Sequence, residues 1–241
     1  MIERKSYRRI LLKLSGEALA GGEGFGLSPQ ILNYIAQEIA ELHHLNTQIA
    51  VVVGGGNFVR GETFSAEGGI DRSVADQMGM LGTLMNSLGL QSAIEKAGVP
   101  VRVQSAISIS QVAESFIRRR AIRHLEKGRV VVFAAGTGNP YFTTDTAAVL
   151  RALEIDAEIL IKATKVDGIY DKDPKRFADA VRYETLEYSE AIGKRLAVMD
   201  QTAFTMCREH RLPVIVLDFN KPGALVHAVQ GMNEGTLVGG E

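Results

Sequence analysis

Short apolar runs alternate with longer amphipathic stretches along most of the chain. The runs are rich in Val, Ile and Leu, and nearly every position in them is apolar, as in strands that are covered on both faces. They predict strands at Ile10–Leu14, Gln48–Val53, Val101–Gln104, Arg129–Phe133, Ile159–Lys162 and Val214–Leu217. This pattern is typical of a mostly parallel sheet with helices over both faces.

Helical spacing appears between these runs. Ser28 is a favoured N-cap and Pro29 suits a first helical position, so a helix is expected to begin there. Its apolar stripe would be Ile31, Ile35, Ile39 and Leu42. Further helices are expected at Arg72–Lys96, Asp145–Glu154, Asp200–His210 and Gly223–Gln230. Ser105–Arg120 and Val166–Ser189 are too irregular to assign.

The alternation continues without a linker or repeat. We therefore expect an α/β protein in which residues 1–241 form a single domain, a three-layer α/β/α sandwich with a mostly parallel central sheet. Cys207 is the only cysteine, which excludes an intrachain disulfide and a cysteine zinc cluster and suggests a buried helical residue.

Charge is balanced, with 27 Lys and Arg against 28 Asp and Glu and a formal net charge of −1. This gives no long-range field for nucleic acid or a membrane surface, so neither is expected as a partner, whereas a small anion needs only local charge. The start, Met1 to Lys5, has no signal-like segment, and no run approaches the roughly 18–20 apolar residues of a membrane helix. A cytoplasmic location is expected.

Three glycine clusters each follow a predicted strand: Lys13-Leu14-Ser15-Gly16, Gly54-Gly55-Gly56-Asn57 and Gly136-Thr137-Gly138-Asn139-Pro140. Open α/β sheets bind ligands beyond the carboxyl ends of their strands, where glycine lets backbone N–H groups approach phosphate oxygens. Any one cluster could be an ordinary turn, but three at equivalent ends of one sheet favour a phosphate site.

The two commonest nucleotide motifs are absent. No Gly-Lys-Ser/Thr follows a cluster, and Val59 stands where a dinucleotide fingerprint needs its third glycine. Lys13, at the exit of an apolar strand, needs an anionic partner unless it is a plain surface lysine. The histidines do not indicate a metal site.

The chain resembles the bacterial UMP kinases of the amino-acid-kinase fold family over nearly its full length. The lysine-Ser-Gly start and the triple glycine, continuing to Arg60-Gly61, indicate the wider family. The run from Gly136 to Asp145 and the segment Lys162-Ala163-Thr164-Lys165-Val166-Asp167-Gly168 are specific to UMP kinases, and Asn220-Lys221-Pro222-Gly223 completes the match. The resemblance, not composition or spacing, carries the substrate assignment: transfer of the γ-phosphoryl group of ATP to UMP.

The resemblance also implies the site. ATP would be held by Lys13, Leu14, Ser15, Gly16, Gly56, Arg60, Thr164, Tyr170 and Asp173. UMP would be held by Gly55, Asp76, Thr137, Gly138, Asn139, Pro140, Tyr141, Phe142, Thr143 and Thr144. Two of these have plainer interpretations, because Asp76 could be a solvated helix carboxylate and Tyr170 could pack a turn.

The chemistry needs no strong general base, because a phosphomonoester is largely dianionic at neutral pH, with a second pKa of about 6. The site must align two polyanions and spread the charge of the transferring group. Lys13 is the expected catalytic cation, Lys162 the second, and Asp200 would orient them unless it is simply an N-cap. Mg²⁺ should accompany ATP without a protein metal motif.

Gly21, Gly22, Glu23, Gly24, Phe25 and Gly26 form a glycine-rich segment poorly suited to helix or strand. It could be a plain connector. The resemblance implies instead an allosteric nucleotide site in a homohexamer, activated by GTP and inhibited by UTP.

Two other functions remain open. One is a carboxylate or carbamate kinase of the same fold, which would have no reason to carry the run from Gly136 to Asp145. The other is an oxyanion or nucleotide storage protein that binds ATP without turnover, against which Lys13 and Asp200 argue.

Overall fold

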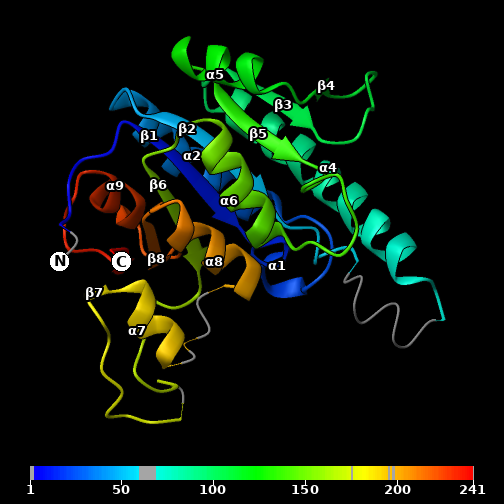
Figure 1. The fold of residues 1–241 in the computed structure, drawn as a ribbon. Helices are drawn as coiled ribbons and strands as arrows, with labels where there is room; N and C mark the ends of the chain where they lie inside the picture. The colour runs from blue at the N-terminus through cyan, green and yellow to red at the C-terminus, as the bar shows by residue number, and fades with distance from the viewer. Residues whose placement is uncertain (1–2, 60–68, 175, 195, 197–198, 241) are drawn as a thin grey trace.

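The computed structural model describes residues 3–59, 69–174, 176–194, 196 and 199–240. Within these residues, nine strands form one sheet in the order β4-β3-β5-β2-β1-β6-β8-β9-β7. Figure 1 shows β3 and β5 toward one end of this sheet and β8 toward the other. The strands are β1 Arg9–Leu14, β2 Gln48–Val53, β3 Val101–Ser105, β4 Glu114–Ser115, β5 Val130–Ala134, β6 Ile159–Thr164, β7 Thr185–Leu186, β8 Val214–Asp218 and β9 Thr236–Val238. Neighbouring strands are parallel except β8 and β9, which are antiparallel.

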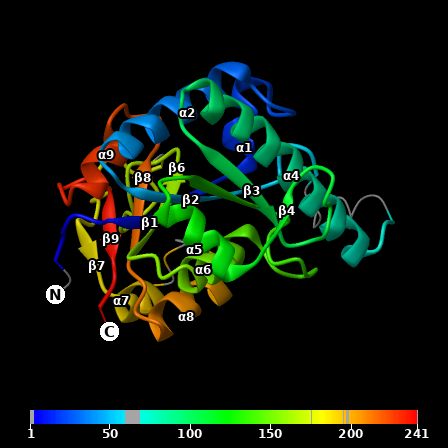
Figure 2. The ribbon, with the colours of Figure 1, turned by 90° about the horizontal axis from the view of Figure 1, so that it is seen from above.

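Helices cover both faces of this sheet. They are α1 Gly16–Leu19, α2 Pro29–His44, α4 Arg72–Lys96, α5 Arg118–Glu126, α6 Thr144–Glu154, α7 Tyr188–Gly193, α8 Gln201–Glu209 and α9 Ala224–Val229. Figure 2 shows α2 and α4 on one side of the sheet and α5, α6 and α8 on the other. Two apolar clusters match these layers, one including α2, α4 and α9 and the other α5, α6, α7 and α8. The predicted α/β sandwich with a mostly parallel sheet is confirmed.

Successive side chains of β1 point to opposite faces of the sheet, and this alternation decides on which face Lys13 lies. Leu12 packs into the cluster under α2 and α4, whereas Leu11 packs into the cluster under α6. Side chains two residues apart on a strand share a face, so Lys13 projects on the α6 side. The same reasoning places Lys162 with Leu160, which packs into the α6-side cluster.

Helix starts follow the capping residues. The Ser28 hydroxyl accepts a hydrogen bond from Ile31 N at 3.5 Å, and Pro29 occupies the first position of α2. Cys207 is buried in α8, as predicted. No described helix is long and apolar enough to cross a membrane.

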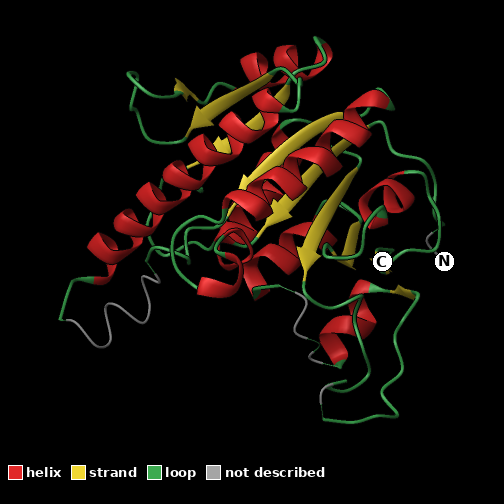
Figure 3. Ribbon diagram, turned by 180° about the vertical axis from the view of Figure 1, so that it is seen from behind, coloured by secondary structure: helices red, strands yellow, loops and turns green. Residues whose placement is uncertain are grey.

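All predicted strands and helices are present, with bounds shifted by at most two residues. Three short strands, β4, β7 and β9, and the helices α1, α5 and α7 were not predicted. The missed strands have only two or three residues, too few to show alternation. Most of the segment between β6 and β7 is loop (Figure 3), and α7 begins just after β7.

Candidate active site

The glycine loops that follow β1, β2 and β5 meet at one edge of the sheet, because these strands are neighbours and parallel. The first two loops touch backbone to backbone. A Cβ on Gly16 would lie 2.7 Å from Gly56 N, and one on Gly54 would lie 2.8 Å from Gly16 N. Side chains at these positions would push the loops apart, so glycine is required for the approach.

Two buried amides hold the second loop in place. Asn86 of α4 donates to the Gly54 carbonyl at 2.6 Å and exchanges side-chain hydrogen bonds with Asn57 at 2.7 and 2.9 Å. Asn57 also donates to the Gly26 carbonyl at 2.6 Å. Gly55 lies against α4, since a Cβ there would be 2.4 Å from the Gly79 carbonyl oxygen. The loop is therefore fixed to the helix before any ligand arrives.

Lys13, Lys162 and Asp145 form an ion-pair cluster beside these loops. Lys13 Nζ lies 2.7 Å from Asp145 Oδ1, and Lys162 Nζ lies 2.7 Å from Asp145 Oδ2. The three side chains are only 11%, 16% and 12% exposed, in the order Lys13, Lys162, Asp145. The two lysines therefore share the Asp145 carboxylate, and the negative charge of Asp200 also acts on Lys162.

The two lysines also set the electrostatics of the carboxylate. Burial alone would raise the pKa of Asp145, but Lys13 and Lys162 outweigh it and hold that pKa below its ordinary value. For Lys162 burial is the largest effect, and it lowers the pKa of the ammonium group against the opposing charge of Asp145. Asp145 therefore opposes the effect of burial on the pKa of Lys162, while the two lysines lower the pKa of Asp145 itself.

Asp200 fixes the helix that carries Asp145. Its carboxylate caps α8 by accepting from Ala203 N at 2.9 Å, and it accepts hydrogen bonds from the Thr143 and Thr146 hydroxyls. Thr143 is in turn the N-cap of α6. Asp200 can thus influence the positions of the lysines indirectly, because it holds the start of α6, which carries Asp145.

Two cavities adjoin the cluster. The first, about 510 Å³, is lined by the second and third glycine loops, by Asp76 and Arg72 of α4, and by Thr143 and Thr144. The second, about 530 Å³, contains Lys162 and Thr164 of β6 and the segment after β6. Pockets of this size suit small-molecule ligands, and together they can take two.

Sequence and structure comparisons agree with this geometry. The model of the amino acid kinase family matches residues 8–218. The chain belongs to the amino acid kinase family. Within it, the uridylate kinase of Dichelobacter nodosus (strain VCS1703A) is 55% identical over 232 residues, covering 96% of each chain.

Two solved structures are similar over nearly the whole fold. The UMP kinase from Bacillus anthracis has a TM-score of 0.94 and 39% identity, covering 98% of this chain and 97% of that one. The UMP kinase from Ureaplasma parvum has a TM-score of 0.91 and 34% identity, with both chains covered completely.

Most residues expected to hold UMP line the first cavity: Gly55, Asp76, Thr137, Asn139, Phe142, Thr143 and Thr144. Gly138, Pro140 and Tyr141 lie in the same loop. Asp76 is not a solvated carboxylate, because its side chain is 14% exposed, pairs with Arg72 at 3.0 Å and accepts from Tyr141 N at 2.8 Å. It therefore joins α4 to the third glycine loop across this cavity.

The residues expected to hold ATP are spread over three cavities: Leu14, Ser15 and Thr164 line a third one of about 330 Å³, and Gly56 lines the first. Thr164, Tyr170 and Asp173 line the second cavity. Leu14, Ser15, Gly16 and Gly56 lie at the loops that contact each other, where Ser15 caps α1 by accepting from Ala18 N at 3.2 Å. Arg60 lies outside the described residues.

Sequence reasoning missed several residues of the site. Asp145 was seen only as part of a motif and as a helix start, because its pairing depends on which strands are neighbours. Arg72 and Thr83 line the first cavity from α4. Thr83 is buried, and its hydroxyl accepts from Ala135 N at 2.7 Å, which anchors the third loop. The helical periodicity of the sequence shows on which face of α4 these residues lie, but it does not show that this face lines a cavity.

The glycine-rich segment contains one short regular element that was not predicted. Gly21–Glu23 form a 3-10 turn, whereas the sequence argued against helical structure. Gly26 N donates to the Asn57 carbonyl at 3.1 Å, and the exposed Phe25 ring meets Phe58 edge to face at 5.8 Å between centroids. The segment is thus attached to the second glycine loop.

Proposed function

We propose that this chain is a UMP kinase that transfers the γ-phosphoryl group of ATP to UMP, giving UDP and ADP. The Lys13–Asp145–Lys162 cluster carries the proposal, because it connects residues of both cavities. Lys162 lines the second cavity, and Thr144, next to Asp145, lines the first. The uridylate kinase of Dichelobacter nodosus, at 55% identity, supports the choice of UMP.

The first cavity is the proposed UMP site, and Thr164, Tyr170 and Asp173 in the second hold the nucleoside of ATP. Backbone N–H groups of the glycine loops would face phosphate oxygens between them. A UMP phosphate is largely dianionic at neutral pH, so no residue has to remove a proton to make the nucleophile. The residues must align the two phosphates and exclude water.

Lys13 and Lys162 stabilise the charge that develops on the transferring group. Their ammonium groups are held by Asp145, so they need little reorganisation as the charge moves. Asp200 acts behind them, through Thr143 and the start of α6.

Mg²⁺ fits this site as the companion of ATP. Asp145 is paired with two lysines, and no cluster of three or more His, Cys, Asp or Glu side chains that could hold a metal occurs among the described residues. Mg²⁺ often keeps its waters and takes few protein ligands. When bound, it would neutralise charge on the ATP phosphates, while the protein residues hold and orient the nucleotide.

We also place residues 1–241 in one nucleoside monophosphate kinase domain that acts as a homo-oligomer, a hexamer. Val74, Leu81 and Met85 are each 46% exposed on α4, with spacings of seven and four residues that place them on one stripe. An apolar stripe of this kind supports self-association. GTP is the proposed activator and UTP the inhibitor, acting on segment 21–26.

A cytoplasmic location and a role in pyrimidine nucleotide biosynthesis belong to the same proposal, since the reaction draws on ATP and UMP. The test is ADP release with UMP, CMP, AMP or aspartate as acceptor. Rapid release with UMP supports the proposal. Release only with aspartate would make the chain a carboxylate kinase, and ATP binding without release would make it a storage protein.

A further inference from the structure

A hairpin-like segment, described at residues 169–174 and 176–183, carries Tyr170 and Asp173 to the second cavity. Its two sides are joined by an antiparallel bridge between Tyr170 and Arg182. Backbone hydrogen bonds from Tyr183 N to Ile169 O at 2.8 Å and from Asp171 N to Val181 O at 3.1 Å flank this bridge. The position of the hairpin base therefore sets where its cavity residues lie.

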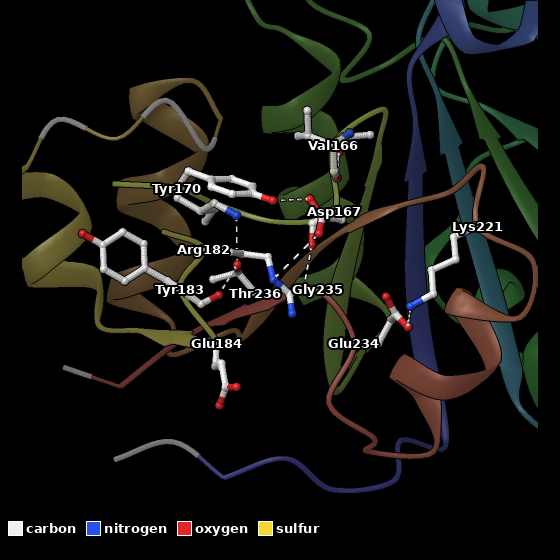
Figure 4. A network of polar contacts seen from close by, with 12 residues as sticks. Val166, Asp167, Tyr170, Arg182, Tyr183, Glu184, Lys221, Glu234, Gly235 and Thr236 are labelled. Carbon is white, nitrogen blue, oxygen red and sulfur yellow. Dashed lines mark hydrogen bonds and ion pairs between the residues drawn. The ribbon is translucent and has the colours of Figure 1, made fainter. Parts of the chain in front are cut away.

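One buried hydroxyl fastens both sides of this base to the sheet. Thr236 of β9 is fully buried, and its Oγ1 accepts from Ile169 N at 2.8 Å and donates to Tyr183 O at 2.5 Å (Figure 4). The hydroxyl also needs Gly168, because a Cβ there would lie 2.5 Å from Thr236 Oγ1. The hairpin base is thus built around this atom.

The strand that carries Thr236 is itself held firmly. Thr236 is the antiparallel register partner of Val216, which lines the second cavity. Just before it, Arg4 donates to the carbonyls of Glu234 and Gly235 at 2.8 and 2.9 Å. The buried Glu234 carboxylate pairs with Lys221 at 2.7 Å, which Figure 4 also shows. Thr236 therefore has a well-defined position in β9, and its hydrogen bonds attach the hairpin to the sheet.

Arg182 extends the attachment to the phenol of Tyr170. Its Nη1 donates to the Asp167 carbonyl at 2.9 Å, and its Nε lies 3.9 Å from Asp167 Oδ2. The Tyr170 hydroxyl donates to Asp167 Oδ1 at 2.7 Å (Figure 4). Arg182 thus holds Asp167, and Asp167 orients the Tyr170 ring beside the cavity.

We infer that Thr236 and Arg182 are positioning residues for the ATP nucleoside: they touch no nucleotide but fix the hairpin that does. The inference rests on the proposed function, in which Tyr170 and Asp173 hold that nucleoside. Neither residue contacts the first cavity or the lysine cluster. Their loss should therefore weaken ATP binding selectively and leave UMP binding and the chemical step nearly unchanged.

The test compares Thr236→Val, which keeps the shape but loses the hydroxyl, with Thr236→Ser, which keeps the hydroxyl. The Val variant leaves a buried N–H and a buried carbonyl without partners, so the KM for ATP should rise about tenfold. The KM for UMP and kcat should stay within about twofold, because their residues lie elsewhere. The Ser variant should resemble the wild type.

Arg182→Met and Arg182→Lys give a second, more exposed pair that tests the inference if Thr236→Val fails to fold. Met should raise the KM for ATP severalfold, and Lys, which keeps the charge but not the fork of donors, should not fully rescue it. Calorimetric titration with ATP alone gives the same comparison without an acceptor, so it remains valid if UMP is the wrong substrate. Folded variants with unchanged ATP affinity, or with equal losses for ATP and UMP, would overturn the inference.

Discussion

Lys13 and Lys162 are register partners on the neighbouring parallel strands β1 and β6, and both ammonium groups lie 2.7 Å from the Asp145 carboxylate. The pairing of strands brings together two residues that are 149 positions apart in the sequence. Asp145 lets two partly buried cations share a small volume, which is what a site for polyphosphate requires.

Lys13→Ala should lose most of the turnover while the KM for UMP changes little, because the charge is needed as the γ-phosphoryl group moves. Removing one such preorganised group typically costs about 10²–10³ in rate. Steady-state kinetics at saturating ATP and UMP measures this, with the exposed Lys127→Ala at the end of α5 as the control. A Lys13→Ala enzyme that keeps more than half of the wild-type kcat would remove Lys13 from this role.

Asp145→Asn should destabilise the fold in a pH-dependent way. The pKa of Asp145 lies below its ordinary value of 3.8, so its stabilisation is complete above that pH and is lost as the pH falls through the lower folded value. Leaving two cations without their anion should cost about 3–5 kcal/mol of unfolding free energy at neutral pH. Denaturant titrations at several pH values should show the difference from wild type shrinking below pH 3.8.

The double variant Asp145→Asn with Lys162→Met tests the cause of this loss. It removes one cation with the anion, so it should recover part of the stability but none of the turnover. Equal stability of Asp145→Asn and wild type at neutral pH would mean that the ion pairs contribute nothing to the fold.

UMP should be strongly preferred to CMP. Uracil presents a carbonyl acceptor and an N–H donor where cytosine presents an amino donor and an acceptor, so a pocket that pairs with uracil leaves its polar groups unmatched by cytosine. Such mismatches can change kcat/KM by about 10⁴–10⁵. Similar kcat/KM values for the two monophosphates would contradict a uracil-specific pocket.

GTP should raise the rate at fixed, subsaturating ATP and UMP, and Phe25→Ala should reduce this response while sparing basal turnover. Phe25 is 68% exposed and contacts Phe58 of the second glycine loop. An effector that orders segment 21–26 can therefore shift the populations of the conformations of this loop. ADP must be the measured product, with Mg²⁺ in excess, and Val112→Ala is a matched exposed control. A flat GTP titration of a protein shown to be oligomeric by light scattering would leave segment 21–26 a connector.

The fold was largely predictable because its long strands and helices carry strong periodicity. The apolar run of β2 and the capped start of α2 needed no tertiary information. By contrast, β9 has three residues, and its antiparallel pairing with β8 depends on a chain reversal that the short sequence pattern does not encode. Thr236, the fastening residue of the hairpin, was missed for that reason.

The site was predictable where it follows local motifs and not where it depends on the sheet order. Glycine loops after strands placed Gly16, Gly54 and Gly56 at one edge, as expected for parallel strands. The sharing of Asp145 by two lysines requires that β1 and β6 be neighbours and that α6 cover their common face. Neither fact can be read from spacing along the chain.

Phosphoryl transfer itself is tested most directly by following the label from ATP carrying radioactive phosphorus in its γ position, with UMP as the acceptor. The account predicts that the label appears in UDP, with one ADP formed per UDP, and that Lys13→Ala slows its appearance by about 10²–10³. Label that remains in ATP, or is released as inorganic phosphate while UMP stays unchanged, would contradict it.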